Sequence, residues 1–174
     1  DAKDDLSIQV HPDDAYAKAH ENGSLGKTEC WFILDCKENA TLVVGHNAKT
    51  KEELEQMIHE GRWKEFIREI PIKPGDFIQI DPGTVHAIKG GTLLLETQQS
   101  SDITYRVYDY DRLSNGKPRQ LHIVQSIDVI TVPAKSADNS VVHIEKKDDA
   151  IQQLIQCPYY TVYRIDVEHR VETW

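Results

Sequence analysis

Glutamine and histidine lie two positions apart in the stretch LSIQVHP, residues 6 to 12. Alternating aliphatic and polar residues predict a strand here. Alternate residues of a strand share a face, so Gln9 and His11 are expected to point together, with Ser7 beside them. An amide and an imidazole side by side are candidate ligands of a metal ion. The opposite face is expected to hold only aliphatic side chains: Leu6, Ile8 and Val10.

A carboxylate opens the next predicted strand, in GKTECWFILD, residues 26 to 35. Strand alternation places Glu29 on one face with Trp31 and Ile33. Burying a carboxylate among such side chains is costly unless it is paired or bound to a metal. Lys27 is a possible partner on the same side, so an ordinary ion pair is the alternative interpretation of Glu29. The other face is expected to hold Cys30, Phe32 and Leu34.

A third candidate follows a Pro-Gly turn in GDFIQIDPGTVHAI, residues 75 to 88. The chain returns at Thr84, so His86 is expected to face inward with Thr84 and Ile88. Two imidazoles, one carboxylate and one amide on inward-facing positions form a mixed nitrogen and oxygen ligand set that suits zinc, iron or manganese. A single inward histidine is more often a hydrogen-bonded core residue, so this prediction depends on the whole set.

The elements that carry these residues are mostly short strands bounded by turn residues. This pattern predicts a mainly β sandwich or barrel in a single domain of 174 residues. Thr50 followed by Glu53 is a capping-box pattern, and apolar residues at helical spacing on both sides of Gly61 predict a helix or helix pair over 50–69. A shorter helix is plausible near residues 12–23. The predicted strands are LSIQV, CWFILD, ATLVVG, DFIQID, GTLLLET, ITYRVYDY and YYTVYRIDV.

Composition limits the partners of this chain. A net charge of −9 argues against nucleic-acid binding, which needs a basic stripe. No run of about 18 apolar residues is present, so no membrane-spanning helix is expected. The three cysteines form no CxxC pattern and favour a reducing compartment, which makes a cytoplasmic location the expectation.

Several of these motifs together resemble a known family. The stretch GDFIQIDPGTVHAI is similar to the second cupin motif, and the Gln-x-His pair followed by a glutamate is similar to the first. More narrowly, LSIQVHPDD, GKTECW, PGTVHAI and LETQQSSDITYRVYDYDR resemble type I mannose-6-phosphate isomerases, over roughly residues 5–133. The resemblance implies a cupin-type β-barrel (jelly roll) at 1–132 with one or two helices packed on it, the inserted helix at 50–69, and a loop with the start of a C-terminal β segment at 133–174.

The resemblance also implies roles for individual residues. One zinc ion per chain would be bound by Gln9, His11, Glu29 and His86. The implied reaction interconverts mannose 6-phosphate and fructose 6-phosphate through an enediol or enediolate, which needs proton transfer and positive charge near the developing oxyanion. Arg106 would stabilise the negative charge of the enediolate or its phosphate, and Glu96 and Lys27 are candidates for transferring the proton. A salt bridge of Glu96 with Arg106 or Lys27 is the alternative interpretation. Expected substrate contacts come from Ser7, Lys89 and Asp102, with Ser100 and Ser101 as further donors.

Other interpretations stay open at this point. A metal-containing cupin that only binds a sugar or sugar phosphate would need the ligands but not Arg106 or Glu96, and a cupin oxygenase would use iron. Compared with the family, the chain is expected to be a core fragment, either a monomer or self-associating through open edge strands. Arg112 and Arg119 are expected to be surface residues. Six histidines are expected to be surface or structural residues: His20, His46, His59, His122, His143 and His169.

Overall fold

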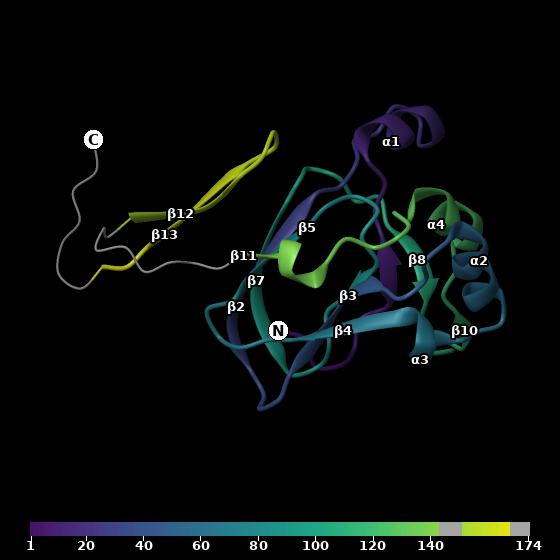
Figure 1. Cartoon of the computed structure of the whole chain (residues 1–174), viewed down its shortest axis with the longest axis horizontal. Helices are drawn as coiled ribbons and strands as arrows, with labels where there is room; N and C mark the ends of the chain where they lie inside the picture. The colour runs from purple at the N-terminus through teal and green to yellow at the C-terminus, as the bar shows by residue number, and fades with distance from the viewer. Residues whose placement is uncertain (143–150, 168–174) are drawn as a thin grey trace.

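Two antiparallel sheets form the body of the protein in this computed structural model, which describes residues 1–142 and 151–167 (Figure 1). The five-stranded sheet has the order β4-β3-β6-β1-β8 and the four-stranded sheet the order β11-β5-β2-β7. The strands of the first sheet are β1 (Ile8–Val10), β3 (Thr41–His46), β4 (Ile67–Pro71), β6 (His86–Ala87) and β8 (Tyr105–Tyr108). Those of the second sheet are β2 (Glu29–Cys36), β5 (Phe77–Ile80), β7 (Thr92–Gln98) and β11 (Val141–Val142).

The space between the two sheets holds one apolar cluster. Trp31 and Ile33 of β2 meet Leu42 and Val44 of β3 there, and all four are fully buried. The other face of β2 carries Cys30, Phe32 and Leu34, as the alternation predicts. The expected mainly β, barrel-like architecture is therefore confirmed, with the predicted inward face of β2 on the inside.

A second apolar cluster lies between the five-stranded sheet and the helices α2 (Lys51–His59), α3 (Trp63–Phe66) and α4 (Ile123–Val129). Ile8 and Val10 of β1 point into this cluster and are fully buried. Leu6 was expected to join them, but it precedes the strand and is 45% exposed, so this part of the prediction is wrong. The aliphatic face of β1 thus packs between the barrel and its helical layer.

The helix expected over 50–69 is two helices followed by a strand. The predicted cap is present: Glu53 N donates to Thr50 Oγ1 at 3.2 Å, while the Glu53 carboxylate accepts from Lys49 N at 2.6 Å. Gly61 has a φ of +65°, which ends the first helix. Residues 67–69 belong to β4, because pairing with β3, in which Glu69 lies opposite Val43, outweighs the local helical pattern.

The remaining elements surround this body. The helix α1 (Asp14–His20) is shorter than the stretch considered from the sequence, and Asp13 rather than Pro12 begins it by accepting a hydrogen bond from Tyr16 N. The helix α4 and the strand β12 were not predicted. The small hairpin β9 (Leu113–Ser114) and β10 (Lys117–Pro118) turns at Asn115-Gly116.

A C-terminal hairpin packs on the outer face of the four-stranded sheet. Leu154 of β12 (Ile151–Gln156) and Val162 of β13 (Thr161–Ile165) join Cys30 and Phe77 in a third apolar cluster. A short 3-10 helix, Ala137–Asn139, precedes β11, which pairs with β5. Parts of the segment 133–174, expected to be a loop with the start of a β segment, lie outside the described residues, as do His143 and His169.

All seven strands predicted from the sequence are present, with small shifts in their ends. The strand β1 lies between β6 and β8, and Gln9 is opposite both His86 and Arg106. This register brings three of the predicted site residues to one place. In the part of the chain that the structure describes, no helix is long and apolar enough to cross a membrane.

Candidate metal centre and active site

Three predicted ligands meet at one end of the barrel interior. Glu29 Oε2 lies 3.4 Å from His11 Nε2, and Glu29 Oε1 lies 3.3 Å from His86 Nε2. The three side chains are almost completely buried, and one ligand atom from each lies within 4.8 Å of the others. The predicted set of two imidazoles and one carboxylate is therefore brought together by β2, β6 and the residue after β1.

Backbone carbonyls fix the orientation of both imidazoles. His11 Nδ1 donates to the carbonyl of Ile103 at 2.9 Å, and His86 Nδ1 donates to the carbonyl of Thr84 at 2.8 Å. A carbonyl can only accept, so Nδ1 carries the proton in each ring, and in the neutral rings Nε2 presents its lone pair to the cluster. This is the arrangement usually found for histidines that bind metal ions.

The burial of these groups leaves acceptors without donors. Within the described residues, His11 Nε2 and Glu29 Oε2 are buried and have no hydrogen-bond partner, although Glu29 Oε2 forms an ion pair with Lys27 Nζ. Burial lowers the pKa of His86 to about 4, which favours the neutral imidazole. Burial raises the pKa of Glu29, but its contacts with His11, His86 and Lys27 outweigh this and hold the pKa at about 2. A lone pair and a carboxylate oxygen facing each other fit a bound cation.

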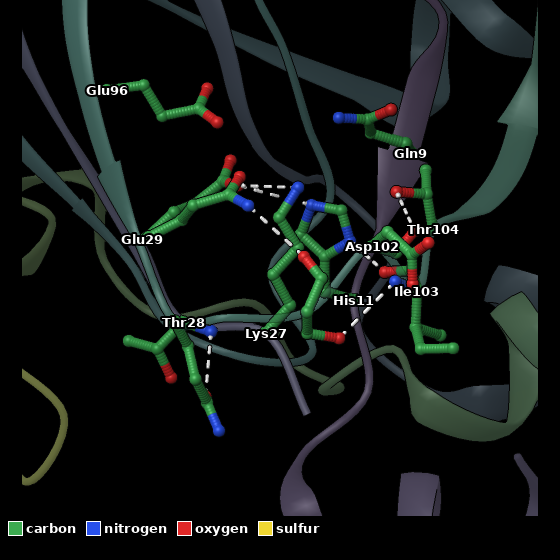
Figure 2. A network of polar contacts seen from close by, with 12 residues as sticks. Gln9, His11, Lys27, Thr28, Glu29, Glu96, Asp102, Ile103 and Thr104 are labelled. Atoms are coloured by element: carbon green, nitrogen blue, oxygen red, sulfur yellow. Dashed lines mark hydrogen bonds and ion pairs between the residues drawn. The ribbon is translucent and has the colours of Figure 1, made fainter. Parts of the chain in front are cut away.

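Gln9, the fourth predicted ligand, lies next to the cluster formed by His11, Glu29 and His86 (Figure 2). Its amide nitrogen is 3.3 Å from His86 Nε2. Rotation of the amide by half a turn would place its oxygen there instead. The side chain therefore has the reach and the chemistry of an oxygen ligand.

Lys27 and Glu96 flank Glu29. Lys27 Nζ lies 3.3 Å from Glu29 Oε2, so the ion pair considered from the sequence is present beside the two histidines. Glu96 of β7 extends toward the same region (Figure 2) and accepts a hydrogen bond from Trp31 Nε1 at 3.2 Å. Partial burial of its carboxyl group, together with the charge of Glu29, raises the pKa of Glu96, although the residue as a whole is exposed. The alternative role for Glu96, an ion pair with Lys27 or Arg106, is not among its contacts in the described residues.

Arg106 is opposite Gln9 in the sheet, so its side chain starts on the cluster side of β8. Its Nη1 donates to the carbonyl of Gln120 at 2.8 Å, whereas its Nε is buried and has no partner in residues 1–142 and 151–167. His122 accepts a hydrogen bond from Arg106 N and donates its own backbone N–H to Arg106 O. From the sequence, His122 was expected to be a surface or structural residue, and no local motif indicates that it binds the backbone of β8.

The predicted substrate contacts separate into two groups. Ser7 is buried beside β1, and Asp102 lies in the loop whose next residue, Ile103, holds His11 (Figure 2). Lys89 is not brought to the site. Alternation after His86 turns it to the other face of the sheet, where its Nζ lies 2.9 Å from both carboxylate oxygens of Glu69. Ser101 Oγ donates to the carbonyl of Leu25, while Ser100 is exposed.

Arg112 and Arg119 lie at the surface, as expected, and both also bind the buried carboxylate of Asp109. Arg119 Nε lies 2.7 Å from Asp109 Oδ2, and Arg112 Nη2 lies 2.7 Å from Asp109 Oδ1. The hydrogen bond from Arg119 is the first cause of a lowered Asp109 pKa of about 2. This cluster follows β8 and fixes the segment after Arg106. His46, also left as surface or structural, is a buried residue whose Nε2 donates to the carbonyl of Thr131 at 2.9 Å.

Comparison with known proteins gives a consistent result. The chain is 55% identical over 163 residues to mannose-6-phosphate isomerase ManA of Bacillus subtilis, covering 93% of this chain and 52% of that protein. It is 49% identical over 173 residues to mannose-6-phosphate isomerase of Streptococcus mutans, covering 99% of this chain and 54% of that protein. No family model matches the chain.

The structural comparison agrees. The crystal structure of mannose 6-phosphate isomerase from Bacillus subtilis superposes with a TM-score of 0.88 at 49% identity, over 97% of this chain and 54% of that one. A phosphomannose isomerase variant from Salmonella typhimurium, at 15% identity and a TM-score of 0.69, shares the fold. The resemblance to this family and the expected cupin fold are therefore confirmed, and the chain spans about half the length of the relatives it matches.

Proposed function

We propose that this chain carries the catalytic barrel of a mannose-6-phosphate isomerase and interconverts mannose 6-phosphate and fructose 6-phosphate. One observation carries the proposal: His11, Glu29 and His86 form a buried group of ligand atoms within 4.8 Å of one another, in a chain about half identical to enzymes of that name. The sugar phosphate is the proposed partner, and a cytoplasmic location remains a prediction.

The metal we propose is zinc. His11, Glu29 and His86, with Gln9 as the fourth residue, match the nitrogen and oxygen ligands that zinc accepts. When bound, zinc would polarise the sugar oxygens as a Lewis acid. The ligands and their supporting carbonyls are already oriented, so the chain itself fixes where this charge acts.

The proton transfer is assigned to Glu96. An aldose becomes a ketose when a proton leaves carbon 2 of the sugar and one is delivered to carbon 1. A base for this step needs a pKa above that of an ordinary carboxylate, and burial together with Glu29 raises the pKa of Glu96. Lys27, held at Glu29 by a 3.3 Å contact, is placed to move the proton between the two sugar oxygens.

We assign to Arg106 the role of binding the negative charge of the substrate. Its buried Nε lacks a partner, and an oxygen of the enediolate or of the phosphate would accept that hydrogen bond. Ser7, a buried residue two positions before Gln9, and Asp102, which lies near His11 in Figure 2, are proposed to bind the sugar hydroxyls. Lys89 is omitted from this proposal because Glu69 binds its ammonium group elsewhere.

The deciding experiment measures conversion of mannose 6-phosphate to fructose 6-phosphate by the chain, with added zinc and after chelation. Zinc-dependent turnover is expected. A chain that binds zinc and mannose 6-phosphate but forms no product would instead be a binding cupin. Oxygen consumption with bound iron would indicate an oxygenase.

A further inference from the structure

The segment that carries Lys27 is held by two side chains from other parts of the chain. Asp14 Oδ1 accepts hydrogen bonds from Gly26 N at 2.8 Å and from Gln99 Nε2 at 2.7 Å. Gln99 Oε1 in turn accepts from Thr28 N at 3.3 Å, and Gln99 N donates to the Thr28 carbonyl at 2.8 Å. The residues on both sides of Lys27 are therefore bound to one carboxylate–amide pair.

The backbone of Lys27 itself is also fixed. Lys27 N donates to the Pro12 carbonyl at 3.0 Å, so three consecutive N–H groups, those of residues 26 to 28, have partners. Gly26 lies directly against the start of α1: a Cβ at this position would be 2.4 Å from the carbonyl carbon of Asp13. Only glycine permits this approach, which brings Asp14 to the segment.

The pair of Asp14 and Gln99, which we call the clamp, connects the segments that carry Lys27 and Glu96, the two candidates for proton transfer. Gln99 comes directly after β7, the strand that carries Glu96, and is buried. Lys27 is buried as well, and its ammonium reaches Glu29 at 3.3 Å. A lysine side chain has four flexible bonds, so a fixed backbone is needed to keep its ammonium at one point.

Asp14 accepts these hydrogen bonds as a carboxylate. Hydrogen bonds from Gln99, then Gly26, then Tyr159 lower the pKa of Asp14, so the carboxylate is the stable form. Tyr159, in the turn between β12 and β13, donates to Asp14 Oδ2 at 2.9 Å. Charge-assisted hydrogen bonds of this kind are stronger than neutral ones.

We propose that Asp14 and Gln99 are positioning residues that hold the Lys27 segment so that the Lys27 ammonium stays at Glu29 during the reaction. The position of Lys27 follows from the contacts described above. The effect of this positioning on turnover rests on the proposed isomerase function. A general structural role for Asp14 at the start of α1 is the competing explanation.

Asp13 provides the matched control. It lies next to Asp14 and accepts from Tyr16 N at 2.8 Å, which caps α1, but its side chain makes no contact with residues 26 to 28 among the described hydrogen bonds. Asp13→Ala should therefore weaken the start of α1, as loss of a cap does, without releasing Lys27. Asp14→Asn keeps an oxygen for both donors and is expected to preserve the clamp.

The first measurement is the rate at which trace acetic anhydride acetylates Lys27, read by peptide mass spectrometry on the zinc-loaded chain and its variants. Asp14→Ala and Gln99→Ala should each raise this rate by about tenfold or more, because a buried amine becomes accessible when its segment opens. Asp13→Ala and Asp14→Asn should leave it within about twofold. If Asp14→Ala does not fold, Gln99→Ala decides the result.

The second measurement is steady-state isomerisation by the same variants. Asp14→Ala and Gln99→Ala should lower kcat by about tenfold or more with little change in KM, since misplacing a reacting group slows the chemical step. Continued protection of Lys27 in both variants, or equal exposure by Asp13→Ala, would overturn the proposal. Absence of turnover in the unmodified chain would contradict the isomerase function, while the acetylation result would still decide the positioning role.

Discussion

His11 Nε2 and Glu29 Oε2 lie 3.4 Å apart in the barrel interior, and neither buried atom has a hydrogen-bond partner among the residues that the structure describes. His11 Nδ1 donates to the carbonyl of Ile103, so Nε2 is the ring nitrogen that faces the carboxylate oxygen and is free to bind a metal ion. The Lys27 ammonium, 3.3 Å from Glu29 Oε2, already offsets part of the carboxylate charge, and a cation held between the two atoms would stabilise this arrangement further. The experiments below follow from this relationship and from the groups around it.

Replacing Glu29 by alanine should abolish zinc binding and turnover, because it removes the only carboxylate among the three clustered ligands. Zinc per chain after dialysis, measured by inductively coupled plasma mass spectrometry, should fall from about one to near zero. Glu69→Ala is the control, since Glu69 binds Lys89 and not the cluster. Full zinc occupancy in Glu29→Ala would remove this residue from the ligand set.

Replacing Arg106 by alanine should leave zinc bound but lower kcat/KM by roughly 100-fold or more, the scale of losing one charge that stabilises a transition state. The guanidinium has a buried Nε without a partner, which the substrate is expected to supply. Arg62→Ala, which removes a guanidinium paired with the exposed Glu65, serves as the control. Near-normal kinetics of Arg106→Ala would exclude this residue from the mechanism.

Glu96→Gln should lower kcat by roughly 10²-fold or more, the usual contribution of a general base. In the unmodified chain, Glu96 works only as the carboxylate, so turnover should rise as pH increases through its pKa. Burial and the charge of Glu29 raise that pKa, so the midpoint should lie above the value of about 4.3 for an ordinary glutamate. The measurement is kcat against pH, and a midpoint at or below the ordinary value would contradict the assignment.

Asp109→Asn should destabilise the chain at neutral pH, because it leaves Arg112 and Arg119 without their shared carboxylate. The folded pKa of Asp109 is about 2, below the unfolded value of about 3.9. Its contribution is therefore complete above the unfolded pKa and is lost as pH falls through the folded pKa.

Melting temperatures of both chains across this pH range test the prediction about Asp109. The difference should be largest near neutral pH and should disappear on acidification toward the folded pKa. Asp166→Asn, which alters an exposed pair with Arg164, is the control and should change little. A difference that is independent of pH would show that the carboxylate charge is not what stabilises the segment.

The sequence by itself identified the candidate ligand residues and predicted the strand faces on which they lie. Strand alternation places Gln9 and His11 together and Glu29 with Trp31, and the structure confirms both because side-chain direction along a strand is a local property. The cap at Thr50 was equally local. The same local pattern misled the prediction for residues 67–69, where pairing with β3 makes a strand.

Only the tertiary structure decided which distant residues meet. The pairing of β1 with β6 and β8 brings Gln9 to His86 and Arg106, and no local pattern specifies that register. The carbonyl partners of the histidines, the Asp14–Gln99 clamp and the capture of Lys89 by Glu69 likewise join residues far apart in the chain or depend on loop conformation. Sequence patterns fix side-chain types and faces, whereas burial, hydrogen-bond partners and pKa shifts arise only when those faces pack together.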